Sequence, residues 1–133
     1  MREILFRGKD VNSNEWRTGY FYTAVQGSVA IIGDGVDGYQ VKPKTVGEYT
    51  GLTDKKGKKI FEGDIIKYIH HGIDEKVVIR YGAPENRYNM YGWYLDDNRG
   101  NTAFRLNEYF IKDYNCRVIG NIHDNPELIG GNK

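Results

Sequence analysis

The sequence predicts a mainly β fold, in which a small N-terminal β unit precedes an SH3-like β-barrel unit with little helix. The composition supports this class, because 11 tyrosines and 17 glycines stand against 3 prolines, and tyrosine and glycine favour short strands and tight turns over helices. Between Ile60 and Ile122 about five short apolar runs alternate with turn-forming residues. None has the length and period of a long helix, so a small barrel or a strongly bent sheet is expected.

The N-terminal β unit is expected over residues 1–48. Strands are predicted at residues 3–7, 16–25 and 28–32, and the polar segment 10–14 between the first two predicts a hairpin. Pro43 cannot donate a ladder hydrogen bond and restricts the residue before it, which places the boundary between the units nearby. The barrel unit is expected over residues 49–128, followed by a disordered tail over residues 129–133.

Two turns of the same chemistry are predicted in the barrel unit. Asp and Gly at the first and fourth positions of DKKG fit a type I turn, and the same spacing recurs in DNRG. A Gly-Asp step also precedes the apolar run IIKYIHH, where it allows a sharp entry into a strand. The residues assigned to these turns are Asp54, Gly57, Gly63, Asp64, Asp97 and Gly100.

The remaining elements of this unit follow from short apolar and aromatic runs. Residues 106–110 fit one helical turn, and Pro126 fits the first position of a short helix. Strands are expected at residues 65–71, 76–81, 89–95, 102–106 and 117–122.

Four lysines surround the first of these turns, at Lys55, Lys56, Lys58 and Lys59. The segment lacks the earlier glycine and the later hydroxyl residue of a Walker loop, so it is not expected to cradle a nucleotide phosphate. Lysines at a hairpin tip are usually solvated and discourage aggregation at a sheet edge. A surface that contacts phosphates stays open as the second interpretation.

The aromatic residues Tyr91, Trp93 and Tyr94 form the other candidate interaction surface. Aromatic side chains with basic neighbours on a barrel face can stack nucleic-acid bases. They equally form the core and rim of a small β domain, or a subunit interface, and the near-neutral chain favours this second interpretation.

No constellation of residues predicts catalysis, a metal or a cofactor. His70 and His71, adjacent in an expected strand, should point to opposite faces, and no metal-ligand spacing joins them to His123 or Cys116. Glu62 and Asp64 would share a strand face as an acid–base pair, but the turn interpretation of Gly63-Asp64 is stronger. No nucleophile motif is present in the sequence.

The charge balance gives no general attraction to nucleic acid or to an anionic membrane, because 19 basic and 18 acidic residues leave a net charge of +1. No apolar run approaches the roughly 20 residues of a membrane span, and the charged N-terminus has no apolar signal segment. The single Cys116 lies in an apolar run and is expected to be buried and inert. These features predict a soluble cytoplasmic protein.

Four segments together resemble the YopX family, small proteins encoded by phages and prophages of Gram-positive bacteria. They are MREILFRGKD, YTGLTDKKGKKIFEGDII, GWYL and VIGNIHDNPELI, in the family's order. Gly8 and residues 24–46 depart from the family pattern. The resemblance implies a C-terminal part similar to SH3-type barrels, and a bacterial host cell as the location. The family has no assigned activity, so no catalytic residue is carried over.

These observations favour a phage or prophage accessory protein that acts by binding rather than catalysis. A homo-oligomer is expected, together with a host or phage protein as partner. The alternative is a nucleic-acid-binding SH3-like barrel module that uses the lysines of the first turn, Arg80, Arg87 and the aromatic residues between Tyr88 and Tyr94.

Overall fold

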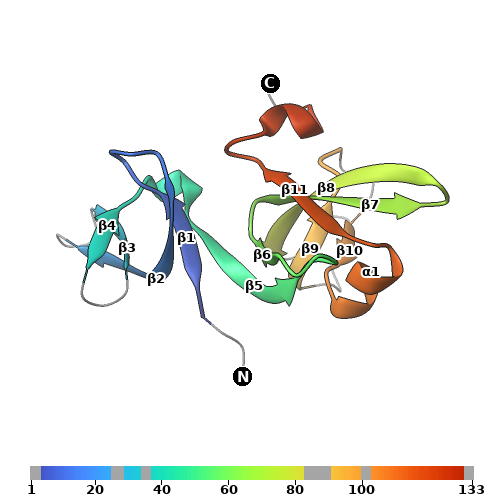
Figure 1. The fold of residues 1–133 in the computed structure, drawn as a ribbon, viewed down its shortest axis with the longest axis horizontal. Helices are drawn as coiled ribbons and strands as arrows, with labels where there is room; N and C mark the ends of the chain where they lie inside the picture. The colour runs from blue at the N-terminus through green and yellow to red at the C-terminus, as the bar shows by residue number, and fades with distance from the viewer. Residues whose placement is uncertain (1–3, 25–28, 34–36, 83–90, 100–102, 131–133) are drawn as a thin grey trace. The chain divides into compact units, whose positions relative to one another are not determined.

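The structure of the protein is a computed structural model that describes residues 4–24, 29–33, 37–82, 91–99 and 103–130. These residues form antiparallel β-sheets, one short α-helix and two 3-10 helices, which confirms the mainly β class (Figure 1). The chain divides into two compact units, Met1–Gly51 and Leu52–Lys133. The division follows residue 51, whereas the sequence places it after residue 48.

The first antiparallel sheet has the strand order β4-β3-β2-β1-β5-β6, where β6 is Lys59–Phe61. Strands β1 to β4 belong to the N-terminal unit, and β5 continues across the boundary. The predicted hairpin over residues 10–14 is present, with the Asn14 N–H donating to the Asp10 carbonyl over 3.0 Å. A 3-10 helix, η1 (Pro43–Thr45), precedes β5. The strands are β1 (Phe6–Lys9), β2 (Trp16–Ala24), β3 (Val29–Gly33), β4 (Gly38–Gln40) and β5 (Gly47–Thr53).

The two faces of this sheet differ in burial. Ile32 and Val41 are almost fully buried, and with Ala30 they form a small core against which Phe6 and Val46 pack. Because alternate residues of a strand face opposite sides, Tyr20 and Tyr22 lie on the face away from Ile32. Both tyrosines are exposed, at 61% and 44%, so this face presents aromatic surface to solvent.

The Asp10 carboxylate makes the stability of this unit depend on pH. Its oxygens accept hydrogen bonds from the Asn12 and Ser13 N–H groups and from Arg17 Nε, and these backbone bonds, with Arg17, hold the pKa of Asp10 below its ordinary value of 3.8. A lowered folded-state pKa stabilises the fold above the unfolded-state pKa, and the stabilisation is lost as pH falls through the folded-state pKa.

We therefore expect Asp10→Asn to make the free energy of unfolding of the N-terminal unit depend less on pH in the acid range. Wild-type protein will lose stability of the N-terminal unit below about pH 4, and Asp10→Asn will lose less there while being less stable near neutrality. Urea unfolding followed through Trp16 fluorescence in a Trp93→Phe background measures this difference. Parallel profiles for the two proteins would contradict it.

The C-terminal unit contains a second antiparallel sheet in the order β10-β9-β8-β7-β11. Among the described residues its two edge strands, β10 and β11, do not pair with each other, so the sheet is open and the SH3-like barrel stays a prediction. The elements are β6 (Lys59–Phe61), β7 (Asp64–His70), β8 (Ile73–Gly82), β9 (Gly92–Asp96), β10 (Ala103–Arg105), α1 (Glu108–Asp113), β11 (Arg117–Asn121) and η2 (Pro126–Ile129).

One face of this second sheet forms the main core. Ile66, Val77, Ile79 and Leu95 are all 2% exposed or less and belong to one cluster. Their positions agree with the strand pairing, in which Ile66 lies opposite Val77 and Ile79 opposite Leu95. Fully burying such side chains stabilises the fold by about 1.5–3 kcal/mol each, so this cluster is the main packing contribution of the unit.

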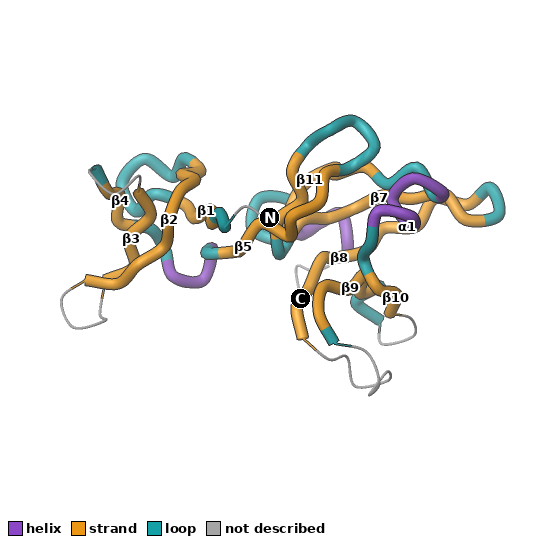
Figure 2. Tube along the Cα trace, turned by 90° about the horizontal axis from the view of Figure 1, so that it is seen from below, coloured by secondary structure: helices purple, strands orange, loops and turns teal. Residues whose placement is uncertain are grey.

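The short helix α1 closes one side of this core. Asn107 begins it, because its Oδ1 accepts a hydrogen bond from the Phe110 N–H over 2.8 Å. Ile111 is buried in the core cluster. After the helix, the Tyr114 carbonyl accepts from the Ile69 N–H over 3.3 Å, which holds the end of α1 beside β7 (Figure 2).

Three sequence-based expectations are corrected. His71 does not continue the strand but takes a φ of 52° in the turn between β7 and β8, as short hairpin turns require. Glu62 lies in the turn before β7 rather than on a strand with Asp64. The expected tail begins too early, because Ile129 belongs to η2 and Gly130 caps that helix. Residues 131–133 lie outside the described part.

Candidate functional site

The lysine-rich turn has the hydrogen bonds of a tight β-turn. The Gly57 N–H donates to the Asp54 carbonyl over 3.0 Å, and the Asp54 N–H donates to the Lys58 carbonyl over 2.7 Å. Gly57 has a φ of 87°, a conformation that other residues rarely adopt. Asp54 Oδ1 accepts from the N–H groups of Lys56 and Lys58, both over 2.9 Å. Local turn chemistry therefore accounts for the glycine and the aspartate.

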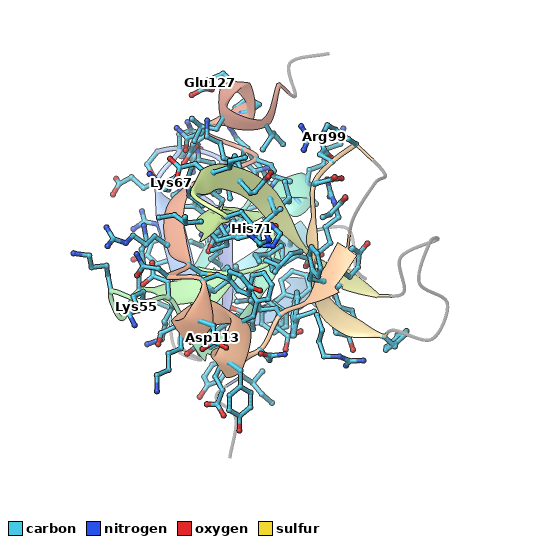
Figure 3. All side chains as sticks on the ribbon, turned by 90° about the vertical axis from the view of Figure 1, so that its right-hand side faces the viewer. Lys55, Lys67, His71, Arg99, Asp113 and Glu127 are labelled. Carbon is cyan, nitrogen blue, oxygen red and sulfur yellow. The ribbon has the colours of Figure 1, made fainter. Side chains whose placement is uncertain are left out.

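Asp54 also ties this turn to the last strand of the sheet. Its Oδ2 accepts a hydrogen bond from the Val118 N–H over 2.9 Å, and the Lys55 N–H donates to the Cys116 carbonyl over 2.9 Å. Asp54 is 6% exposed, whereas the four lysines of the turn, Lys55, Lys56, Lys58 and Lys59, are all exposed. Figure 3 shows Lys55 directed away from the ribbon, far from Arg99. The turn is therefore hydrogen-bonded to β11 and presents exposed cations.

Gly63 and Asp64 have a structural role in the strand entry. Asp64 is 1% exposed, and its Oδ2 accepts from the Phe61 N–H over 2.7 Å. The Gly63 N–H donates to the Ile79 carbonyl, and the Gly63 carbonyl accepts from the Ile122 N–H, each over 2.9 Å. This turn therefore connects β8 to the residue that follows β11, which leaves no role for Asp64 as an exposed acid or base.

The predicted aromatic surface is divided between two faces of β9. Trp93 packs against the core cluster with its ring 4.7 Å from that of Tyr81, while Tyr94 lies on the opposite face, across from Arg80. Tyr91 is 66% exposed, and its ring lies 5.6 Å from that of Tyr81. Strands β8 and β7 separate β9 from β11, beside which the lysine-rich turn is held. The lysines and these aromatics are therefore not brought together.

Cys116 is fully buried, as expected from its apolar surroundings. Burial raises the pKa of its thiol to about 12, and the nearby Asp54 adds to the shift. Because the thiolate is the reactive form, Cys116 is inert at neutral pH. Among the described residues no group of three or more His, Cys, Asp or Glu side chains is placed to hold a metal ion. The described helices include none long and apolar enough to cross a membrane.

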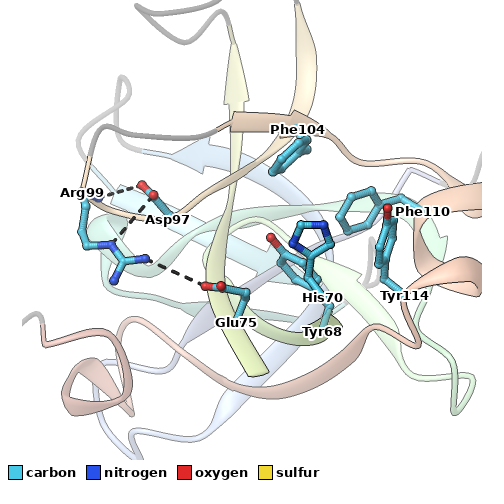
Figure 4. Close-up of a pocket in the computed structure, with 8 residues that line it drawn as sticks. All are labelled: Tyr68, His70, Glu75, Asp97, Arg99, Phe104, Phe110 and Tyr114. Atoms are coloured by element: carbon cyan, nitrogen blue, oxygen red, sulfur yellow. Dashed lines mark hydrogen bonds and ion pairs between the residues drawn. The ribbon is translucent and has the colours of Figure 1, made fainter. Parts of the chain in front are cut away.

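A pocket that the sequence did not predict lies in the C-terminal unit. Its volume is about 270 Å³, and it combines aromatic rings at one end with charged groups at the other (Figure 4). The lining residues are Tyr68, His70, Glu75, Asp97, Arg99, Phe104, Phe110 and Tyr114.

The pocket is the outward continuation of the core face of the sheet. Along β7 this face carries Ile66, Tyr68 and His70 in alternation, and Glu75 of β8 lies directly opposite Tyr68. Phe104 of β10 lies opposite the core residue Leu95 and so shares that face. Apolar residues thus give way to polar ones towards the hairpin tip, which opens the core to solvent at this end.

Residues after β9 and on α1 complete the pocket. Phe110 and Tyr114 bring their rings to 5.2 Å and 5.9 Å from Tyr68, both edge-on, and lie 4.6 Å from each other. Phe104 lies 5.7 Å from Phe110, and His70 lies 5.8 Å from Tyr114. Edge-on and tilted pairs of this kind are favourable, so the rings form a preformed aromatic wall.

The charged end of the pocket is formed by Asp97, Arg99 and Glu75. The Arg99 N–H donates to Asp97 Oδ1 over 2.9 Å. The type I turn expected from Asp97 to Gly100 is not the conformation found, because Asn98 has a φ of 63° where that turn requires about −60°. Gly100 lies outside the described residues. The Arg99 guanidinium is 3.9 Å from both carboxylates. Burial raises the pKa of Tyr68 above its ordinary value, and Glu75 is the largest electrostatic contributor. The neutral form of this hydroxyl is therefore favoured.

One sequence signal could have indicated part of this pocket. A two-residue hairpin at His71-Gly72 places Tyr68, His70 and Glu75 on a single face by strand alternation alone. The sequence-based expectation extended the strand to His71, and with that extension the register of the hairpin could not be recognised. Phe104 and the residues of α1 could not be added, because no local pattern shows which face they approach.

The comparisons with known proteins agree with the resemblance seen in the sequence. The family described as YopX protein matches residues 5–130, which is nearly the whole chain and includes the lysine-rich turn, the Gly-Asp strand entry and the turn after β11. No curated protein matches the chain. The chain therefore belongs to the YopX family.

Proposed function

We propose that this YopX-family protein is a phage or prophage accessory protein that acts in the host cytoplasm by binding a protein partner. The C-terminal unit serves as an SH3-like binding module, and the aromatic pocket receives a side chain of the partner. The observation that carries this proposal is the open pocket itself, with its aromatic wall and its charged rim. Concave aromatic sites with a few converging polar groups are typical binding sites.

Self-association through the N-terminal unit is the second part of the proposal. Tyr20 and Tyr22 are exposed side by side on one strand face, and exposed tyrosines are enriched at protein interfaces. We expect light scattering over the micromolar range to give a mass above that of one chain. The double substitution of both tyrosines by serine should lower that mass, and Tyr109→Ser, which removes a tyrosine exposed by 71% elsewhere, should leave it unchanged. A wild-type monomer at all concentrations would contradict this part.

Capture of a partner from phage-infected cells tests the pocket. Wild-type protein and Tyr109→Ala should capture the same partner, with and without nuclease treatment. Tyr114→Ala removes a pocket ring from the same helical region and should reduce capture by about tenfold, since truncation of an aromatic anchor costs more than 1 kcal/mol. Equal capture by Tyr114→Ala would contradict the pocket as the binding site.

The alternative function, nucleic-acid binding, is supported by the four exposed lysines on the hydrogen-bonded turn. It predicts affinity for DNA or RNA that falls with salt concentration and falls again when these lysines become neutral. The separation of the lysines from the aromatics of β9 weighs against a continuous surface for a single strand. A partner that is lost on nuclease treatment would favour nucleic-acid binding. If the protein bound neither DNA nor RNA at low salt, this alternative would be contradicted.

A further inference from the structure

The charged end of the pocket carries more negative than positive groups. Two carboxylates, Glu75 and Asp97, face one guanidinium, that of Arg99, among the lining residues. The side chain of Asp97 is only 6% exposed and that of Glu75 is 35% exposed. The pocket therefore has electrostatic complementarity to a cation, at the place where the aromatic wall ends.

Arg99 holds these carboxylates weakly. Its guanidinium lies 3.9 Å from the nearest oxygen of each, beyond hydrogen-bond distance, and its side chain is 68% exposed. In the part of the chain that the structure describes, the Glu75 carboxylate has this ion pair and no hydrogen bond. Exposed ion pairs contribute about 0–1 kcal/mol, so the Arg99 side chain can leave at little cost.

We propose that the pocket recognises a lysine or arginine side chain of the partner protein, and that Arg99 occupies the carboxylates until the guest cation replaces it. This inference rests on the proposed function and names the chemistry of its guest. The apolar stem of the guest lies against Phe104 and Phe110, as long cationic side chains commonly do. Its charge reaches Glu75 beside the ring of Tyr68, where a carboxylate and an aromatic face act together on a cation.

The size and charge of the pocket limit other guests. At about 270 Å³ it is below the roughly 300–1,000 Å³ of most small-molecule sites and suits one side chain. A phosphate group would have one guanidinium as a partner against two carboxylates, so the net charge of these groups disfavours it. The raised pKa of Tyr68 agrees with this, because burial and the Glu75 charge both disfavour a second negative group there.

Titration with short peptides tests the guest. The probes are the acetylated and amidated tripeptides Gly-Arg-Gly and Gly-Lys-Gly, with the uncharged Gly-citrulline-Gly and Gly-norleucine-Gly as shape-matched controls. We expect the cationic peptides to shift the amide NMR signals of the pocket residues and to bind about tenfold more tightly than the uncharged peptides. Equal binding of norleucine would overturn cation recognition while leaving the pocket as a binding site.

Two charge-neutralising substitutions test the roles of Glu75 and Arg99. Glu75→Gln should lower the affinity for the arginine peptide about tenfold. Arg99→Gln should raise that affinity several-fold, because the Arg99 guanidinium no longer competes for the carboxylates. Glu127→Gln, which removes an exposed carboxylate outside the pocket, should change nothing. Weaker binding to Arg99→Gln, or unchanged binding to Glu75→Gln with a native amide spectrum, would overturn the proposal.

The two proposals fail in different ways. If the cationic peptides do not bind but Tyr114→Ala still captures less of the partner, the pocket binds a different kind of side chain. That result contradicts cation recognition and leaves the proposed function of the pocket intact. If the partner is captured equally by wild-type protein and Tyr114→Ala, the proposed function of the pocket falls, whatever the peptides do.

Discussion

Asp54→Ala will lower the free energy of unfolding of the C-terminal unit by about 3 kcal/mol, because three backbone N–H groups lose a charged acceptor at once. Two of them, those of Lys56 and Lys58, belong to the turn, and the third belongs to Val118 in β11. The side chain is 6% exposed, so water cannot readily replace it. Urea unfolding followed through Trp93 fluorescence in a Trp16→Phe background measures the loss.

Asp54→Asn separates the two parts of this effect. Its amide oxygen can still accept from the turn, but its NH₂ group would face the Val118 N–H, donor against donor. We expect a loss of about 2 kcal/mol, intermediate between wild type and alanine. Asp74→Ala is the matched control, because this aspartate is 57% exposed in a 3.8 Å surface ion pair with Lys67, and it should cost less than about 1 kcal/mol. A wild-type value for Asp54→Asn would show that the tether to β11 contributes nothing.

Gly19→Ala will destabilise the N-terminal unit by about 3 kcal/mol, through backbone strain and overlap combined. Gly19 has a φ of 156°, and a Cβ there would lie 2.4 Å from the carbonyl oxygen of Gly33 on the neighbouring strand. That oxygen belongs to the backbone, so the strands themselves must move apart. Urea unfolding followed through Trp16 fluorescence in a Trp93→Phe background measures the effect.

Thr18→Ala is the control for this substitution on the same strand. Thr18 is exposed, so its replacement should change stability only by its strand propensity, about 1 kcal/mol or less. If Gly19→Ala were as stable as Thr18→Ala, the close approach of β2 to Gly33 would not constrain the fold.

Features that depend on neighbouring residues could be predicted from the sequence. The turn at Asp54 and Gly57 follows from the two residue types and their spacing, and its hydrogen bonds match that chemistry. The short helix after Pro126 and the hairpin at Asp10 follow in the same way. What the sequence could not show is that Asp54 has a second oxygen bonded to Val118, 64 residues away.

The pocket could not be predicted because its walls come together only in three dimensions. Tyr68 and Glu75 are joined by a local hairpin, but Phe104 approaches them from the edge strand β10, and Phe110 and Tyr114 approach from α1 and its C-terminal end. Asp97 illustrates the difference, because spacing predicted only a turn there, while its place beside Glu75 and Arg99 depends on the pairing of β8 with β9. The aromatic surface expected from Tyr91, Trp93 and Tyr94 is divided for the same reason, because the pairing of β9 places Trp93 and Tyr94 on opposite faces of the sheet.

The bond from Asp54 to Val118 has a consequence for the order of folding. β11 is the last strand among the described residues, and it pairs with β7, the first strand of the same sheet in chain order. On the ribosome, neither the lysine-rich turn nor that edge of the sheet can be completed until β11 has emerged. Contacts of such sequence separation slow folding, so the newly made C-terminal unit should pass through a period in which β7 is an open edge that a chaperone or a second nascent chain could engage.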